Sequence, residues 1–109
     1  MNRALDYIEH IHEAATLAVS YVEGMQRADF LDDTRTQQAV VMNLIIIGEA
    51  ATKLLQETPD ITEQHPDVAW RNMRGMRNRL AHGYFEIDMD VVWDTVTHAL
   101  PDLIEQLNP

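Results

Sequence analysis

Apolar residues recur at intervals of three and four along most of the chain, which is the periodicity of amphipathic helices rather than of strands. The first stripe predicts a helix from Arg3 to about Gly24. A second, more apolar stripe begins beyond a run of possible capping residues, Asp32 to Thr34, and continues until Thr58-Pro59 ends it. Because this second helix is apolar over much of its circumference, we expect it to lie at the centre of the fold.

The remaining sequence predicts shorter helices. One helical turn is expected from Asp60 to His65, and Pro66 begins a third helix that Gly83 closes as a residue of left-handed backbone conformation. Asp88 can cap a fourth helix. Pro101 either kinks that helix or starts a short fifth one.

Composition supports one small folded domain over residues 1–109, since 46% of the side chains are apolar and 24% are charged. With the periodicity, this predicts an all-α, antiparallel four- to five-helix bundle. A chain of this length buries roughly 65% of its unfolded surface, so a second copy would be a natural supplement to the core. The longest aliphatic run is Leu44 to Ile47, and the N-terminus does not resemble a signal peptide, so we expect no membrane segment. The absence of cysteine favours a cytoplasmic location.

The net charge of −10 by itself argues against a nucleic-acid partner. The basic residues, however, are concentrated in one segment. Between Trp70 and His82 there are four arginines and no acidic residue. These arginines are Arg71, Arg74, Arg77 and Arg79. Such a cluster is typical either of an anion-binding site or of a helix C-terminus, whose dipole favours cations.

Four polar side chains with complementary chemistry stand at the end of this segment: Arg77, Asn78, His82 and Tyr84. On an ideal helix Arg77 and His82 point about 140° apart, whereas Asn78 and His82 share a face. Because we expect Gly83 to break the helix, the long Arg77 side chain can reach round to His82. A hydrogen bond from Asn78 could fix the tautomer of the imidazole.

These groups are sufficient to cleave RNA without a metal ion. A neutral His82 can take the proton from a ribose 2′-OH, whose oxygen then attacks the adjacent phosphorus, while Arg77 holds the phosphate oxygens. The product would be a 2′,3′-cyclic phosphate. Taken alone, such a pair is more typical of a histidine at a helix end and a surface cation than of a catalytic site.

The order Arg77, four residues, His82, one residue, Tyr84 resembles the signature of HEPN domains of the HepT toxin type. The resemblance covers essentially the whole chain in order and spacing. Its further parts are Phe30 to Val40, Leu44 to Ala50, Pro66 to Trp70, Gly75 to Asp88, Trp93 and Leu100-Pro101. One modest departure is Gln38, where an acid is frequent in the family.

The resemblance implies a homodimer in which the motif lines a cleft between the subunits, and a metal-independent ribonuclease toxin acting on RNA through Arg77 and His82. It also implies a cognate antitoxin, a minimal nucleotidyltransferase that can transfer AMP to the motif tyrosine, here Tyr84. No cofactor is expected.

Supporting roles are expected for four further residues. Glu49 lies in the most apolar predicted helix, so its carboxylate must be paired or lie at the edge of the cleft, where it could bond an arginine of the motif. Asn78 and Arg74 belong to the motif segment itself. Asp33 is interpreted as a helix cap rather than as a catalytic acid.

Two alternatives stay open at this stage. In the first, the chain is a non-catalytic helical subunit of a nucleotidyltransferase complex, and the motif binds a nucleotide or a partner. In the second it is a structural dimerisation bundle, which the arginine cluster disfavours. We expect no metal site, because His10 and His12 point about 200° apart on a helix.

Overall fold

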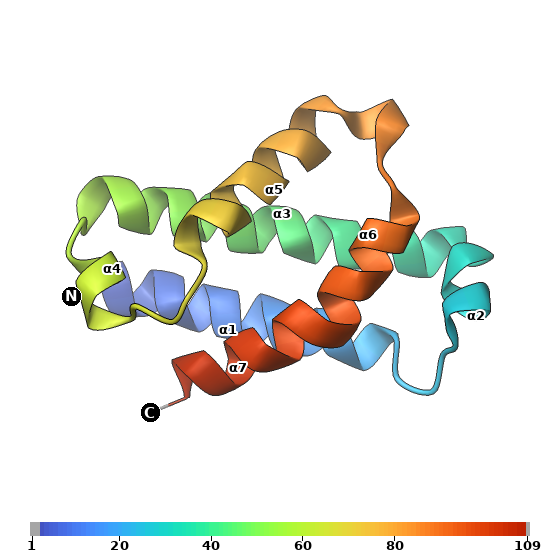
Figure 1. Cartoon of the computed structure of the whole chain (residues 1–109), viewed down its shortest axis with the longest axis horizontal. Helices are drawn as coiled ribbons and strands as arrows, with labels where there is room; N and C mark the ends of the chain where they lie inside the picture. Colours follow the sequence, from blue (N-terminus) through green and yellow to red (C-terminus); the bar gives the residue numbers. More distant parts are fainter. Residues whose placement is uncertain (1–2, 109) are drawn as a thin grey trace.

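The computed structural model describes residues 3–108, which form helices joined by short turns, with no strand in this range (Figure 1). The α-helices are α1 (Arg3–Tyr21), α2 (Arg27–Leu31), α3 (Thr34–Glu57), α4 (Ile61–Gln64), α5 (Trp70–His82), α6 (Met89–Asp94) and α7 (Leu100–Leu107). A 3₁₀ turn, η1 (Tyr84–Glu86), follows α5, and a π-helical turn, η2 (Thr95–Ala99), joins α6 to α7. The expected all-α bundle is confirmed.

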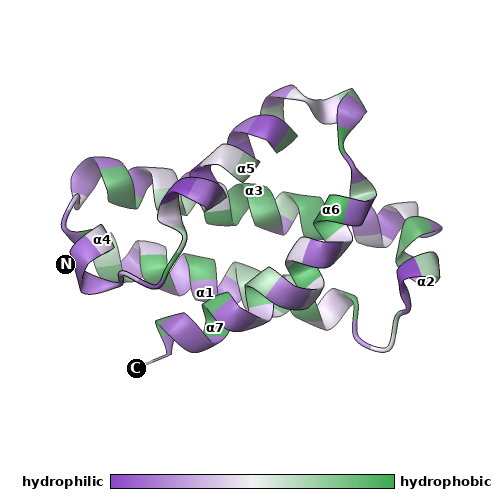
Figure 2. Cartoon of the chain, viewed as in Figure 1, coloured by the Kyte–Doolittle hydropathy of each residue, from purple (hydrophilic) through white to green (hydrophobic). Residues whose placement is uncertain are grey.

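Helix α3 lies at the centre of this bundle, as its hydropathy predicts. It packs against α1 on one side and α5 on another, while α7 packs along α1. Its length and composition would allow it to cross a membrane, but 56% of its most apolar window is buried inside the bundle. Figure 2 shows the contrast with α5, which is hydrophilic along much of its length. The apolarity of α3 is therefore accounted for by its place in the core.

The start of α3 is fixed by Asp33, whose interpretation as a helix cap is confirmed. Its carboxylate accepts hydrogen bonds from the Thr36 backbone N–H at 3.0 Å and from the Thr36 hydroxyl at 2.7 Å. These bonds lower the pKa of Asp33, because they favour the charged carboxylate. Asp33 precedes Glu49 by sixteen residues, roughly 24 Å along α3, so these two acidic residues lie far apart on the same helix.

Helix α5 begins at Trp70, so the expectation of a start at Pro66 is wrong. The residues between them form turns, in which the Val68 backbone N–H donates to the His65 carbonyl at 3.2 Å. The indole N–H of Trp70 donates to the same carbonyl, also at 3.2 Å. A buried Trp70 therefore anchors the first turn of α5.

Gly83 does not have the left-handed conformation predicted for it, since its φ is −101°. It is required for another reason. Its backbone N–H donates to the Arg79 carbonyl at 2.7 Å, and a Cβ at this position would lie 2.8 Å from that carbonyl oxygen. Among the described residues only Gly24, just beyond the end of α1, has a positive φ, of 78°.

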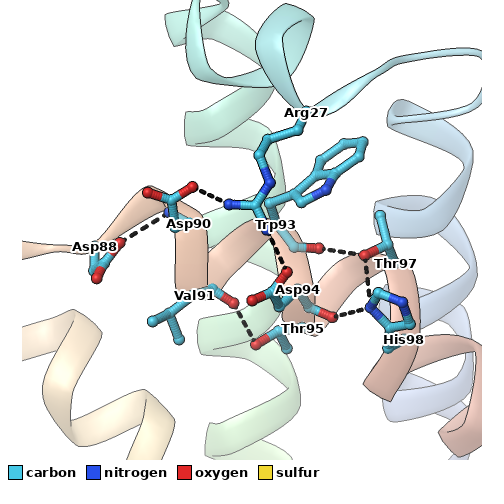
Figure 3. A network of polar contacts seen from close by, with 9 residues as sticks. All are labelled: Arg27, Asp88, Asp90, Val91, Trp93, Asp94, Thr95, Thr97 and His98. Carbon is cyan, nitrogen blue, oxygen red and sulfur yellow. Dashed lines mark hydrogen bonds and ion pairs between the residues drawn. The ribbon is translucent and has the colours of Figure 1, made fainter.

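The C-terminal segment runs from α6 into α7 without a break. Pro101 lies at the start of α7 directly after the π-helical turn, a local irregularity that interrupts the regular helical hydrogen bonding where proline has no N–H to donate. Within and beside this turn, the Thr95 and Thr97 hydroxyls donate to the backbone carbonyls of Val91 and Trp93 at 2.8 and 2.7 Å (Figure 3). The predicted fifth helix is thus present, but it continues the fourth.

Helix α2, which the hydrophobic pattern did not predict, is tied to α6 by charge and by ring contact. The Arg27 guanidinium forms ion pairs with Asp90 and with Asp94, the latter at 2.9 Å (Figure 3). Phe30 is fully buried, and its ring centroid lies 5.4 Å from that of Trp93. These contacts attach α2 to the C-terminal helices, at the far end of α3 from α4.

Candidate active site

Helix α5 carries the candidate chemistry and makes its main packing contacts with α3. Trp70 and Leu80 are buried, and Met73, Met76 and Arg77 are half-buried. The residues on the remaining surface, among them Arg71, Asn78, Arg79 and His82, are exposed. The sequence of α5 therefore has one apolar stripe for α3 and one polar surface left for a ligand.

The two helices come into backbone contact at Gly48. A Cβ built on this glycine would lie 2.2 Å from the Arg77 Cβ and 2.6 Å from the Met73 carbonyl oxygen. No side chain other than hydrogen fits between them. This close approach sets the position of the Arg77 backbone against α3.

The Arg77 guanidinium is held by two side chains from the same turn of α3. Its Nη2 donates to the Thr52 hydroxyl at 3.3 Å, and that hydroxyl donates in turn to the Gly48 carbonyl at 2.8 Å. Its Nε lies 3.4 Å from a Glu49 carboxylate oxygen. This Nε is buried and makes no hydrogen bond within the described residues, so Glu49 acts on it by charge rather than through an aligned hydrogen bond.

Glu49 is thus in contact with an arginine of the motif, one of the two positions considered for it. Thr52 and Gly48 are the residues that sequence reasoning missed. A glycine inside a strongly apolar helix is itself a signal of close helix packing, and Glu49 and Thr52 lie one and four positions beyond it.

His82 lies in the last turn of α5, on a different flank from the Arg77 guanidinium. It is exposed and lines a pocket of about 650 Å³, together with Asn78 and Glu86, whereas Arg77 does not line this pocket. No hydrogen bond joins His82 to Arg77 or to Asn78 within the described residues. The expectation that Arg77 reaches round to His82 is wrong for this structure, because α3 holds the guanidinium on the other flank.

The other motif residues leave a cationic, accessible surface. Arg71, Arg74 and Arg79 form no ion pair with any of residues 3–108, and the Arg79 guanidinium makes a single long hydrogen bond in this range, to the Met76 sulfur at 4.0 Å. Tyr84 follows in η1 and is 62% exposed. Phe85 beside it is 97% exposed, with the two rings edge to face at 5.3 Å.

Metal ligation has no visible basis in residues 3–108, because no three His, Asp or Glu side chains in that range gather where they could hold an ion.

A helical bundle with an arginine-rich helix that carries Arg77 and His82 and is followed, after Gly83, by Tyr84 has the organisation of a HEPN-type domain. Sequence comparison defines the family, because residues 6–109 match the family described as "Ribonuclease HepT-like". The chain belongs to the HepT-like ribonuclease family.

Individual relatives cover most of this chain. It is 41% identical, over 90% of its length and 86% of the relative, to a protein named probable ribonuclease HepT from Thermococcus cleftensis. It is 35% identical, over 93% of its length and 88% of the relative, to a candidate RNase of Caldanaerobacter subterraneus. It is 34% identical, over 82% of its length and 71% of the relative, to a candidate RNase of Methanocaldococcus jannaschii. No solved structure matches the chain.

The helix contact at Gly48 predicts opposite effects for two glycine-to-alanine substitutions. Gly48→Ala should lower the free energy of unfolding by about 1–3 kcal/mol, because the new methyl group would overlap the Arg77 Cβ and the Met73 carbonyl. Gly75→Ala is the matched control within α5, since its nearest neighbour would be the Arg79 Nη1 at 3.8 Å. It should leave stability unchanged or raise it by up to about 1 kcal/mol. Urea denaturation measures both, and equal effects would contradict the close packing.

Proposed function

We propose that the protein is a metal-independent endoribonuclease that acts as the toxin of a toxin–antitoxin pair. The observation that carries the proposal is the presence on one helix of an anchored guanidinium, Arg77, and an exposed imidazole, His82, while the other arginines of that helix have no carboxylate partner among the described residues. Membership of a family described as ribonucleases, and the names of the relatives above, support the same activity. The chain would act as one HEPN domain over residues 1–109.

In the proposed reaction, His82 and Arg77 lie on different flanks of α5 and act on the same phosphodiester. The neutral imidazole of His82 removes the proton of a ribose 2′-OH, and the 2′-oxygen forms a bond to the adjacent phosphorus. The bond from phosphorus to the 5′-oxygen breaks, and the 5′-oxygen takes up a proton from the imidazolium. The products are a 2′,3′-cyclic phosphate and a 5′-hydroxyl. Arg77 stabilises the charge that accumulates on the phosphate oxygens.

The anchoring of Arg77 contributes to this reaction by preorganisation. A free arginine loses rotamer entropy when it binds a phosphate, whereas Thr52 and Glu49 have already restricted this guanidinium. Arg74 and Asn78 lie on the same helix, so they can hold the strand as it crosses the outer surface of α5. Lysine would not replace Arg77, because it lacks the planar group that binds two phosphate oxygens.

Substitution of the two catalytic candidates tests the activity. Arg77→Ala and His82→Ala should each lower the rate of RNA cleavage in EDTA by about a hundredfold or more. His10→Ala and Arg35→Ala, exposed residues of the same types outside α5, should cleave at the wild-type rate. Gel analysis of a defined RNA measures the rates, and circular dichroism confirms that all four variants are folded.

Two results would contradict this mechanism: full activity of either α5 variant, or a requirement for a divalent cation. Wild-type protein that binds RNA or a nucleotide but never cleaves would favour the alternative function, a non-catalytic subunit of a nucleotidyltransferase complex.

A homodimer is proposed because the exposed flank of α3 beside Arg77 is apolar. Met42 and Ile46 are 58% and 40% exposed and precede Glu49 on the same helix face. Phe85, in η1 just beyond the end of α5, is also exposed to solvent. A second copy covering these side chains would place two motifs in one cleft and enlarge a small core.

Light scattering should therefore give about twice the chain mass of 12.5 kDa. Ile46→Asp should shift the protein toward the monomer, because it would bury an unpaired charge in the interface. Leu17→Asp, a similarly exposed residue of α1, should stay dimeric. A wild-type monomer at micromolar concentration would contradict the shared cleft.

Inhibition is proposed to occur through Tyr84. Its phenol is exposed two residues beyond the end of α5, so a cognate nucleotidyltransferase antitoxin in the cytoplasm could reach it. Transfer of AMP would add a phosphodiester anion that pairs with these arginines and occupies the place of the RNA backbone.

This modification predicts a mass increase by one or more AMP units after incubation with the cognate nucleotidyltransferase and ATP. Tyr84→Phe should gain no AMP, whereas Tyr21→Phe, which alters an exposed tyrosine on α1, should be modified like the wild type. The switch is at another residue if Tyr84→Phe is modified, and it does not exist if the modified protein still cleaves RNA.

A further inference from the structure

The pocket beside His82 has an apolar wall that belongs largely to the hydrophobic core and extends beyond it at Val91. The wall is formed by Met76 and Leu80 of α5, and by Ile87, Val91 and Val92 on the approach to α6 and within it. Val91 lines the pocket and is 46% exposed, so the hydrophobic core does not account for this side chain. The pocket also has a polar rim, to which Asn78, Arg79 and Glu86 contribute. An apolar wall with a polar rim suits a flat ring that has polar groups at its edge.

The two flanks of α5 determine which part of an RNA strand reaches this pocket. In the reaction proposed above, the phosphate contacts Arg77 on the flank beside α3, and the 2′-OH that attacks it contacts His82 on the other flank. The phosphate therefore lies over the outer surface near Asn78. The nucleoside that carries the 2′-OH lies on the side of His82, at the mouth of the pocket.

Glu86 gives the pocket a preference among bases. Its carboxylate forms no ion pair with any described residue and offers only hydrogen-bond acceptors. The other nearby carboxylate, that of Asp88, already accepts the Asp90 backbone N–H at 2.9 Å. Guanine presents two adjacent donors on its Watson–Crick edge, its ring N–H and its amino group, while uracil presents a single ring N–H.

We propose that this pocket binds the base on the 5′ side of the cleaved phosphate and that Glu86 makes it select guanine. The proposal rests on the ribonuclease function proposed above. It adds a substrate specificity and names Glu86 and Val91 as the residues that determine it.

DNA oligonucleotides with a single ribonucleotide test the proposal, because cleavage through a 2′-OH is possible only at that position. Wild-type protein should cleave the oligonucleotide containing guanosine about tenfold or more faster than the one containing inosine, which lacks the amino group, or uridine. Glu86→Gln should reduce the ratio of guanosine to inosine cleavage severalfold. Glu105→Gln, an exposed carboxylate of α7, should leave the ratio unchanged.

Val91→Asn should slow cleavage of all these oligonucleotides, since it removes part of the apolar wall. Equal wild-type rates at guanosine and inosine, or an unchanged ratio in Glu86→Gln, would overturn the guanine pocket and leave the ribonuclease function standing. If the wild type cleaves none of the oligonucleotides, the ribonuclease function fails. The binding of the guanosine and inosine oligonucleotides, measured by fluorescence anisotropy, then tests the guanine selectivity independently of cleavage. Equal binding of the two oligonucleotides overturns it.

Discussion

The contact between α3 and α5 at Gly48 is the constraint on which the candidate site depends. Because the Arg77 Cβ and the Met73 carbonyl occupy the space of a missing side chain, α5 lies directly on α3. Glu49 and Thr52, in the same turn of α3, then reach the Arg77 guanidinium without a long flexible side chain between them. A single glycine thereby converts a surface arginine into an anchored one, and leaves the outer surface of α5 available for a ligand.

The distribution of charged residues explains how a chain of net charge −10 can offer a binding surface to an anionic ligand. The acidic residues lie outside α5, and several are used structurally, such as Asp33 at the start of α3 and Asp90 and Asp94 with Arg27. The arginines of α5 have no acid within their own helix, and Glu49 contacts only Arg77 of them within the described residues. The arginines of α5 therefore give this helix a local positive charge that the net charge of the chain does not reveal.

Much of the fold and part of the candidate site could be predicted from the sequence, because they depend on signals within short segments. The apolar stripes, the Asp33 and Asp88 caps and the motif on the third long helix are properties of short segments, and the structure has them. The start of α5 and the backbone of Gly83 could not be predicted, since they depend on contacts made by His65 and Arg79 in these particular turns. Neither could the separation of Arg77 from His82. Helical geometry predicts the angle between the two side chains, but the direction in which the Arg77 guanidinium turns depends on its contacts with α3.

The most direct test is to identify the chemical groups at the ends of the RNA fragments that the protein produces. A short RNA cut by the wild-type protein in EDTA should yield, by mass spectrometry, one fragment ending in a 2′,3′-cyclic phosphate and one beginning with a 5′-hydroxyl. Those ends require attack by the neighbouring 2′-OH, which is the reaction proposed above for Arg77 and His82 without a metal ion. Fragments ending in a 3′-hydroxyl and beginning with a 5′-phosphate would mean that water attacks the phosphorus, and they would contradict the account.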